Sequence, residues 1–418
     1  MVTDRFALPN WRILFGPTSG VIFIRLLSVV SGLAYVKVYT GALPTVEVGT
    51  FFYLSTLSYA LNALIFVPVD FYMQARLTTF AVLPFVALRR LIGWTLALGF
   101  VACIVLGAPL VCLGKLEVMD LPVLYSVAAL LYMCATMRNL LNNRDGKVFV
   151  SSMLLLESLA RLSAFAVANL VYGASARTLM VSSVLALAVE LMFISFRMQG
   201  KLRFETDLGY LDKTATVFRV AAPISGSALC NAMQLQTFRV AYPLVGLSAT
   251  SGLYGVVANI GGQAMGVCAA IYSQIETPRL YQTKGGSLRR YVGLAALLAL
   301  VVFVFTMMFA PFLVRLLTKD QYLPYAYAIG FGVITEAVNL IVGAYTIVLS
   351  LQRRTHLLLK TNFAAAAVSV VGCMLAIRLL PSDPFAIGWI LAGSQLFMAL
   401  VLIAFASIKS KIEQNLIT

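Results

Sequence analysis

Residues 28–66 decide the fold and read SVVSGLAYVKVYTGALPTVEVGTFFYLSTLSYALNALIF. They form two apolar runs joined by a short connection at Pro44, and their only charged residues are Lys37 and Glu47. A helix that crosses a membrane needs about 20 predominantly apolar residues. Each run belongs to an apolar stretch of that length, so this segment predicts a hairpin of two membrane-spanning helices.

The composition extends this prediction to the whole chain. Of its 418 residues, 61% are hydrophobic and 11% are charged, and the mean hydropathy is +0.92. These values exclude an ordinary soluble enzyme and a disordered chain, and long runs without alternation exclude a membrane β-barrel. We expect an all-α polytopic membrane protein. Its twelve predicted spans are 17–39, 48–75, 91–113, 121–141, 148–172, 178–196, 218–244, 250–276, 291–316, 324–350, 361–380 and 385–407.

The net charge of +15 comes from basic residues that punctuate the apolar runs rather than gather on one face, so we expect no nucleic-acid partner. When loops and span ends are assigned alternately to the two sides, 22 of the 31 Lys and Arg fall on the side of the termini. The excess of basic residues on cytoplasmic loops predicts that both termini are cytoplasmic.

A polar stretch divides the chain into two six-helix lobes, 1–196 and 218–418, with a cytoplasmic linker at 197–217. An offset of 203 residues places Tyr39 on Tyr242 and Gly49 on Gly252. Such an internal repeat is typical of transporters built from two bundles, with a substrate cavity between them near the midplane.

Signatures of catalysis are absent from the sequence. The six cysteines have no C-x-x-C spacing, the single histidine is His356 in a basic loop, and there is no phosphate-binding loop. We expect no catalytic residue, no metal and no cofactor.

Two arginines within spans are the main candidates for substrate binding. Arg25 and Arg239 lie on the first helix of each lobe, and the planar guanidinium group suits phosphate oxygens. The alternatives are side chains that reach the cytoplasmic or the outer interface. Further polar candidates, for which hydrogen bonding between helices is the alternative, are Ser28, Tyr35, Asn62, Asn231, Gln234, Asn259 and Gln263.

Two acidic residues within spans are candidates for ion coupling. Glu157 precedes Arg161 by four residues, which predicts either an ion pair within one helix or a pair that opens when an anion competes for Arg161. Glu336 has no basic residue within a turn, so it is a candidate proton or cation site, with a structural carboxyl group as the alternative.

Two segments resemble bacterial polysaccharide flippases of the Wzx type. In residues 28–66 a Gly–aromatic pair, Gly49 and Phe51, begins a second helix that carries Ser55 and Ser58. Residues 325–363, YAYAIGFGVITEAVNLIVGAYTIVLSLQRRTHLLLKTNF, resemble the acid-bearing tenth helix and the basic loop that follows it in that family.

The resemblance implies membership of the multidrug/oligosaccharidyl-lipid/polysaccharide (MOP) exporter superfamily, with two lobes in a V and alternating access, as in MATE transporters. It implies that an undecaprenyl-diphosphate-linked oligosaccharide crosses the bacterial inner membrane, as in O-antigen and lipopolysaccharide synthesis. Arg25, Arg239 and Arg161 would then face the substrate, and Glu336 and Glu157 would couple transport to an ion gradient. Polymerase and chain-length proteins of the same pathway would be partners.

Three alternatives remain open at this point. The lipid II flippase is similar but has two more helices. A drug/cation antiporter of the same superfamily is expected to carry an acid in its first helix, where this chain has Arg25. A membrane-embedded glycan polymerase or ligase is expected to have larger loops.

Overall fold

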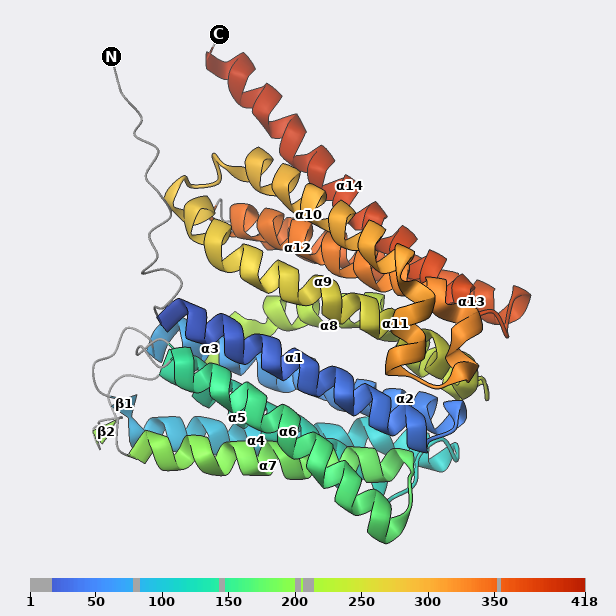
Figure 1. Cartoon of the computed structure of the whole chain (residues 1–418). Helices are drawn as coiled ribbons and strands as arrows, with labels where there is room; N and C mark the ends of the chain where they lie inside the picture. The colour runs from blue at the N-terminus through green and yellow to red at the C-terminus, as the bar shows by residue number, and fades with distance from the viewer. Residues whose placement is uncertain are drawn as a thin grey trace.

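The protein is a bundle of long helices (Figure 1). The structure, a computed structural model, describes residues 17–77, 83–142, 147–199, 204–205, 214–351 and 355–417. The helices of the first half are α1 (Pro17–Ala42), α2 (Thr45–Leu61), the π-helix η2 (Asn62–Phe66), α3 (Val67–Leu77), α4 (Phe85–Cys112), α5 (Asp120–Asn142), α6 (Lys147–Tyr172) and α7 (Ala176–Gln199). Those of the second half are α8 (Thr214–Leu244), α9 (Ser248–Gln282), α10 (Leu288–Met308), α11 (Ala310–Leu317), the 3₁₀-helix η3 (Asp320–Ala328), α12 (Ile329–Leu351), α13 (Thr355–Leu379) and α14 (Pro384–Ile417).

The all-α membrane architecture is confirmed. Among the described residues, eleven helices are long and apolar enough to cross a membrane. The predicted count of twelve is consistent with this number, because α8 is also long but carries Asn231, Gln234, Gln236 and Arg239. The first helix begins and the last one ends toward the same end of the bundle, at the left in Figure 1.

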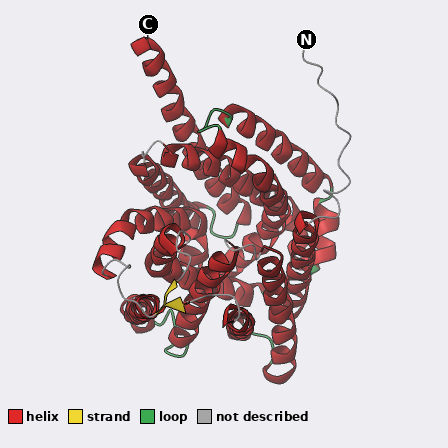
Figure 2. Ribbon diagram, turned by 90° about the vertical axis from the view of Figure 1, so that its left-hand side faces the viewer, coloured by secondary structure: helices red, strands yellow, loops and turns green. Residues whose placement is uncertain are grey.

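Three predicted spans differ in detail from continuous α-helices. The span 48–75 contains the π-helical turn η2 between α2 and α3, and the span 324–350 begins in the 3₁₀-helix η3. The span 291–316 is divided at Phe309 into α10 and α11, next to Pro311, which lacks the backbone N–H that a continuous helix needs. The described part of the chain also contains two strands of two residues each, β1 (Leu83–Pro84) and β2 (Phe204–Glu205), which pair in parallel (Figure 2).

The two halves repeat one packing scheme. In the first half α1 packs on α6, α6 on α7, and α5 on α7, and in the second half α8 packs on α13, α13 on α14, and α12 on α14. The helices of the two halves occupy the lower and upper parts of Figure 1. The predicted linker 197–217 lies largely outside the described residues, so the exact lobe boundaries stay a prediction.

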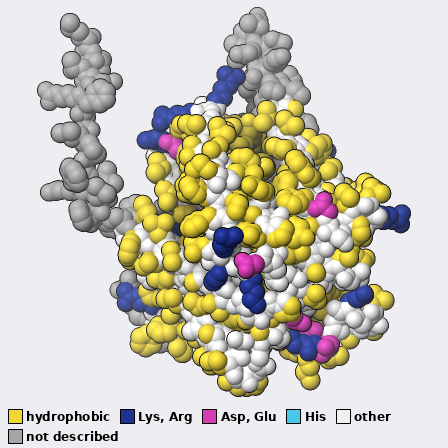
Figure 3. All heavy atoms as spheres, turned by 45° about the vertical axis from the view of Figure 1, so that its right-hand side comes forward, with side chains coloured by type: hydrophobic (Ala, Val, Ile, Leu, Met, Phe, Trp, Pro, Cys, Tyr) yellow, Lys and Arg dark blue, Asp and Glu magenta, His cyan; other side chains and the backbone are white. Residues whose placement is uncertain are grey.

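Hydrophobic side chains cover most of the face seen in Figure 3. Exposed apolar residues include Trp94 and Val105 on α4, and Leu297 and Val301 on α10. Apolar side chains at such positions are stable when lipid, rather than water, surrounds them.

The two charges of residues 28–66 hold the ends of other helices. A carboxylate oxygen of Glu47, Oε2, accepts a hydrogen bond from the backbone N–H of Ala176 at the start of α7 (2.8 Å). Lys37 Nζ donates to the carbonyl oxygens of Thr318 (2.9 Å) and Arg315 (3.3 Å) at the end of α11. Each charge has the sign that the partial charge of the helix end attracts. Lys37 thereby ties the first half to the second.

The halves meet most closely where α2 crosses α9. A Cβ atom on Gly49 would overlap the carbonyl oxygen of Ser248, and one on Gly252 would overlap the carbonyl oxygen of Thr45. The offset of 203 residues relates Thr45 to Ser248 as it relates Gly49 to Gly252. The contact is therefore reciprocal, and it supports the internal repeat expected from the sequence. Only glycine permits backbones to approach this closely.

We predict opposite effects for alanine at two helical glycines. Gly252→Ala places a methyl group against the backbone of α2 and is expected to destabilise the folded protein by about 1–3 kcal/mol, the usual cost of overpacking. Gly293→Ala on α10 meets open space and is expected to leave stability unchanged or raise it, because alanine favours helices. Thermal unfolding in detergent measures both. Equal melting temperatures for the two variants would contradict the close crossing.

Candidate functional site

The predicted site residues fall into three groups in the structure. One group lines a cavity between α1, α6 and α9, a second lines a cavity beside α8, and a third forms an ion network inside the first half. The first two groups face regions where the halves meet. They define the candidate site.

The Arg25 pocket has a volume of about 270 Å³. Arg25 and Ser28 line it from α1, Leu154 lines it from α6, and Gln263 lines it from α9, so both halves contribute to its wall. Among the described residues, Arg25 makes no hydrogen bond or ion pair, and its Nε atom is buried. The hydroxyl of Ser28 donates to the carbonyl of Leu154 (3.4 Å), which attaches α1 to α6.

The Arg239 pocket is smaller, about 120 Å³, and lies between α8, α9 and α12. The Nη1 atom of Arg239 donates to Oε1 of Gln236 (3.1 Å), while its Nε atom is buried without a partner. The guanidinium also lies over the ring of Phe52 on α2, 4.7 Å from the ring centre, in a cation–π contact with the other half. Asn259 and Glu336 line the same pocket. In the described part of the chain, Glu336 makes no ion pair with Arg239 or any other residue.

Helix α9 is the common wall of the two pockets. Asn259 lines the Arg239 pocket and Gln263 lines the Arg25 pocket. Residues four apart on a helix lie one above the other, about 6 Å apart. Arg25 from α1 and Arg239 from α8 therefore each line a pocket that α9 also lines.

The third group is a buried ion network in the first half. Arg161 contacts Glu157 at 2.5 Å, as the sequence predicts for residues four apart. Arg138 on α5 adds contacts to Glu157 (3.2 Å) and to Glu190 on α7 (3.1 Å). Glu190 is fully buried, and one of its carboxylate oxygens has no partner.

Sequence reasoning missed two members of this network. The count of basic residues places Arg138 at the cytoplasmic end of the predicted span 121–141 and gives it no partner, whereas its side chain is only 16% exposed and pairs with two acids. No pattern in the sequence assigns a role to Glu190. A carboxylate in the middle of a span requires a partner, and that requirement was the available signal for Glu190.

Other predicted residues lie within one half. The Nδ2 atom of Asn62 donates to the carbonyl of Ala128 (3.0 Å), and the Nε2 atom of Gln234 donates to the hydroxyl of Ser394 (3.4 Å). Both contacts match the alternative of hydrogen bonds between helices. Tyr35 is buried against the rings of Tyr39 and Phe165, and Asn231 lines none of the pockets described here.

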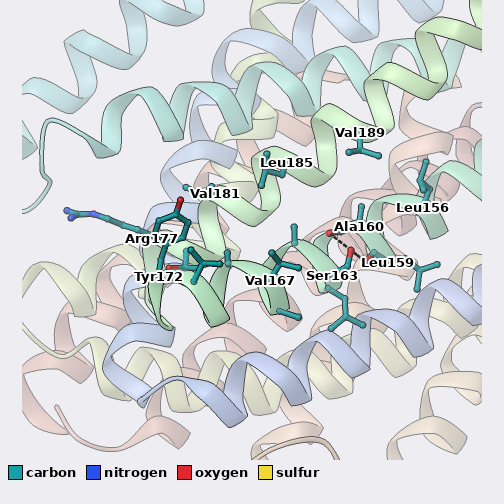
Figure 4. Close-up of a pocket in the computed structure, with 16 residues that line it drawn as sticks. Leu156, Leu159, Ala160, Ser163, Val167, Tyr172, Arg177, Val181, Leu185 and Val189 are labelled. Carbon is teal, nitrogen blue, oxygen red and sulfur yellow. Dashed lines mark hydrogen bonds between the residues drawn. The ribbon is translucent and has the colours of Figure 1, made fainter.

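A larger cavity, about 1260 Å³, has none of these candidate residues in its described lining. It is a groove lined by α6 and α7 alone, with Leu159, Val167 and Leu185 among its residues (Figure 4). Its apolar walls are exposed, as on a surface that faces lipid. The groove is therefore not the candidate site.

No metal site is found among the described residues, where no three His, Cys, Asp or Glu side chains gather to hold an ion. The six cysteines are free.

Comparisons with known proteins identify the fold. No family model and no curated protein matches the chain. Among solved structures, it is similar to an outward-facing multidrug resistance MATE family transporter of the MOP superfamily, with 15% identity, 98% of this chain and 99% of that chain covered, and a TM-score of 0.56. It is similar to the lipid II flippase MurJ in an inward closed conformation, with 11% identity, 94% and 87% coverage and a TM-score of 0.53.

A third similar structure is a MOP superfamily transporter from Pyrococcus furiosus, described as having a binding pocket of reverse polarity, with 15% identity, 97% and 98% coverage and a TM-score of 0.50. At these identities the likeness shows the fold alone. The chain has the fold of MOP superfamily transporters and flippases.

We predict that the ion network stabilises the first half only as a complete set. Arg138→Gln leaves Glu190 buried without its partner and is expected to cost about 3–5 kcal/mol. The double variant Arg138→Gln, Glu190→Gln removes both charges and is expected to regain a large part of that loss. Thermal unfolding of the purified protein measures the difference. Arg378→Gln, at an exposed position without an ion pair among the described residues, serves as the control and is expected to cost less than about 1 kcal/mol. A double variant no more stable than the single one would contradict the pairing.

Proposed function

We propose that the protein is a flippase that carries an undecaprenyl-diphosphate-linked oligosaccharide from the cytoplasmic to the periplasmic leaflet by alternating access. The observation that carries the proposal is Arg25, a guanidinium inside the membrane that lines a cavity between the halves without a partner among the described residues. A charge inside the membrane is stable only beside a counter-ion, a hydrogen-bond partner or water. An anionic substrate supplies that counter-ion.

The charge balance of the cleft supports an anion rather than a cation. Arg25 and Arg239 line the two pockets, which contain one acid, Glu336. The acids of the first half are held elsewhere: Glu157 and Glu190 pair with arginines, and Asp70 accepts hydrogen bonds from Thr136 and Asn139. A diphosphate offers several oxygens to guanidinium groups, which is the pairing that arginine makes best, and both arginine pockets have α9 as a wall.

Coupling to an ion gradient is assigned to Glu336 within this proposal. Glu336 shares a pocket with Arg239 but makes no ion pair in the described part of the chain, so a proton or a cation can reach it when the substrate has left. Glu157 is held by two arginines. We therefore assign the coupling of transport to an ion gradient to Glu336 alone.

The setting of the proposal is the bacterial inner membrane, with both termini in the cytoplasm as the distribution of basic residues predicts. The product would be a periplasmic repeat unit for O-antigen or another polysaccharide. Enzymes that polymerise such units and set their chain length would act next.

An antiporter for drugs or other cations is the second candidate, because the fold is shared with MATE transporters and Glu336 faces a pocket. The two arginines oppose it, since like charge in a binding site repels a cationic ligand. A membrane-embedded polymerase or ligase is less well supported, because the connections from α1 to α2 and from α8 to α9 contain only a few residues.

The proposal predicts that transport depends on both arginines. In liposomes that contain an undecaprenyl-diphosphate disaccharide with a fluorescent group, Arg25→Gln and Arg239→Gln are each expected to slow flipping at least about tenfold, equivalent to about 1.4 kcal/mol. Quenching of the fluorescence from outside reports the leaflet. Arg378→Gln, at an exposed position outside the pockets, is the control and is expected to flip at the unaltered rate. Unaltered rates for both cleft variants would reject the proposal, and uptake of cationic dyes by the unmodified protein would favour the antiporter.

A further inference from the structure

A further recess lies between α2 and α8. This α2–α8 pocket has a volume of about 300 Å³ and is lined by residues that include Tyr59, Ala60, Ala232, Met233 and Gln236. Most of its wall is apolar. Tyr59 and Met233 are 41% and 44% exposed, so the recess is open rather than enclosed.

The internal repeat relates this recess to the Arg25 pocket. Leu26, Val29 and Gln263 line the Arg25 pocket. The offset of 203 residues relates Leu26 to Leu229, Val29 to Ala232, and Gln263 to Ala60. Leu229, Ala232 and Ala60 all line the α2–α8 pocket. The two recesses therefore occupy equivalent places, one between α1 and α9 and the other between α8 and α2.

Their chemistry differs although their positions correspond. The Arg25 pocket presents a guanidinium, a hydroxyl and an amide, from Arg25, Ser28 and Gln263. The α2–α8 pocket is lined mostly by apolar residues, among them alanine, leucine and methionine, and its described lining has no charged residue. Of the two equivalent recesses, one is therefore polar and the other apolar.

Gln236 connects the apolar recess to the anion site. It lines both the α2–α8 pocket and the Arg239 pocket. Its Oε1 atom accepts hydrogen bonds from Arg239 Nη1 (3.1 Å) and from the hydroxyl of Thr56 on α2 (3.2 Å). A ligand with an anionic group at Arg239 and a hydrocarbon chain attached to it would therefore find an apolar recess directly beside its charge.

We propose that the α2–α8 pocket binds the isoprenoid chain of the substrate at the end next to the diphosphate. The inference rests on the proposed function and adds a site for the lipid part of the substrate. At about 30 Å³ for each small group, the recess holds on the order of ten carbon atoms, or about two isoprene units. The rest of the chain stays in the bilayer.

A photo-crosslinking experiment tests the position of the chain. The full-length protein carries a benzophenone amino acid in place of Met233, or in place of Val167 in the α6–α7 groove as a control, in vesicles of phosphatidylethanolamine and phosphatidylglycerol. The probe is radiolabelled undecaprenyl diphosphate. We expect at least about fivefold more labelling at 233 than at 167, and a fall to the control level when Arg239 is replaced by Gln. Equal labelling at both positions would overturn the proposal. So would a competition experiment in which added phospholipid reduces labelling at position 233 as much as added unlabelled undecaprenyl diphosphate does.

A pair of variants tests the role of the recess in transport. Ala232→Trp fills the α2–α8 pocket, whereas Ala164→Trp places the same side chain in the α6–α7 groove. We expect flipping of the fluorescent disaccharide lipid to fall about tenfold for Ala232→Trp only. One outcome separates the two proposals: flipping requires both arginines, neither tryptophan variant affects it, and labelling at position 233 stays at the control level. In that case the α2–α8 pocket does not bind the isoprenoid chain, and the flippase proposal stands. If flipping requires neither arginine, both proposals are wrong.

Discussion

The free-energy cost of an uncompensated charge inside a membrane determines how the charged side chains of this molecule are paired. In the first half, Glu157 and Glu190 are each paired with Arg138, and Glu157 also with Arg161, so these charges cancel where no substrate is required. Arg25 and Arg239 are not cancelled in this way. Because a guanidinium group without a counter-ion is stable in such a place only beside a hydrogen-bond partner, water or an anion, the cavities that Arg25 and Arg239 line are suited to a charged ligand.

The internal repeat provides two similar frameworks, and the side chains make them different. Tyr39 and Tyr242 are buried at equivalent positions, and Gly49 and Gly252 form one reciprocal contact. The repeat does not extend to charge, because the offset that relates these pairs matches Arg25 with Ala228 and Arg239 with Val36. A symmetric backbone with asymmetric side chains suits a substrate that is itself a polar group joined to a long apolar chain.

The sequence predicts the helices because the bilayer requires each spanning helix to have a certain length and an apolar composition. Both properties can be read from a single segment. The Glu157–Arg161 pair is equally local and was predicted. Contacts that join three helices, such as Arg138 to both acids, depend on how helices pack and leave no pattern in the order of residues. The same holds for Gln234, whose position on α8 favoured the cleft, whereas its amide faces Ser394 within the second half. Asn259 and Gln263 were predictable because four-residue spacing on one helix fixes a common face.

The crossing of Gly49 and Gly252 has a mechanical consequence. It lies near the first turn of α9, and the helix continues from Gly252 to Gln282 for about 45 Å at 1.5 Å per residue. Helices whose backbones touch at glycines have little side-chain bulk at that point, and a change in their crossing angle moves the contact least. A tilt of about 10° displaces the far end of α9 by roughly 8 Å while the contact itself hardly moves. If the two halves rotate against each other, the glycine contact is the fulcrum and the length of α9 sets how far the opposite end travels.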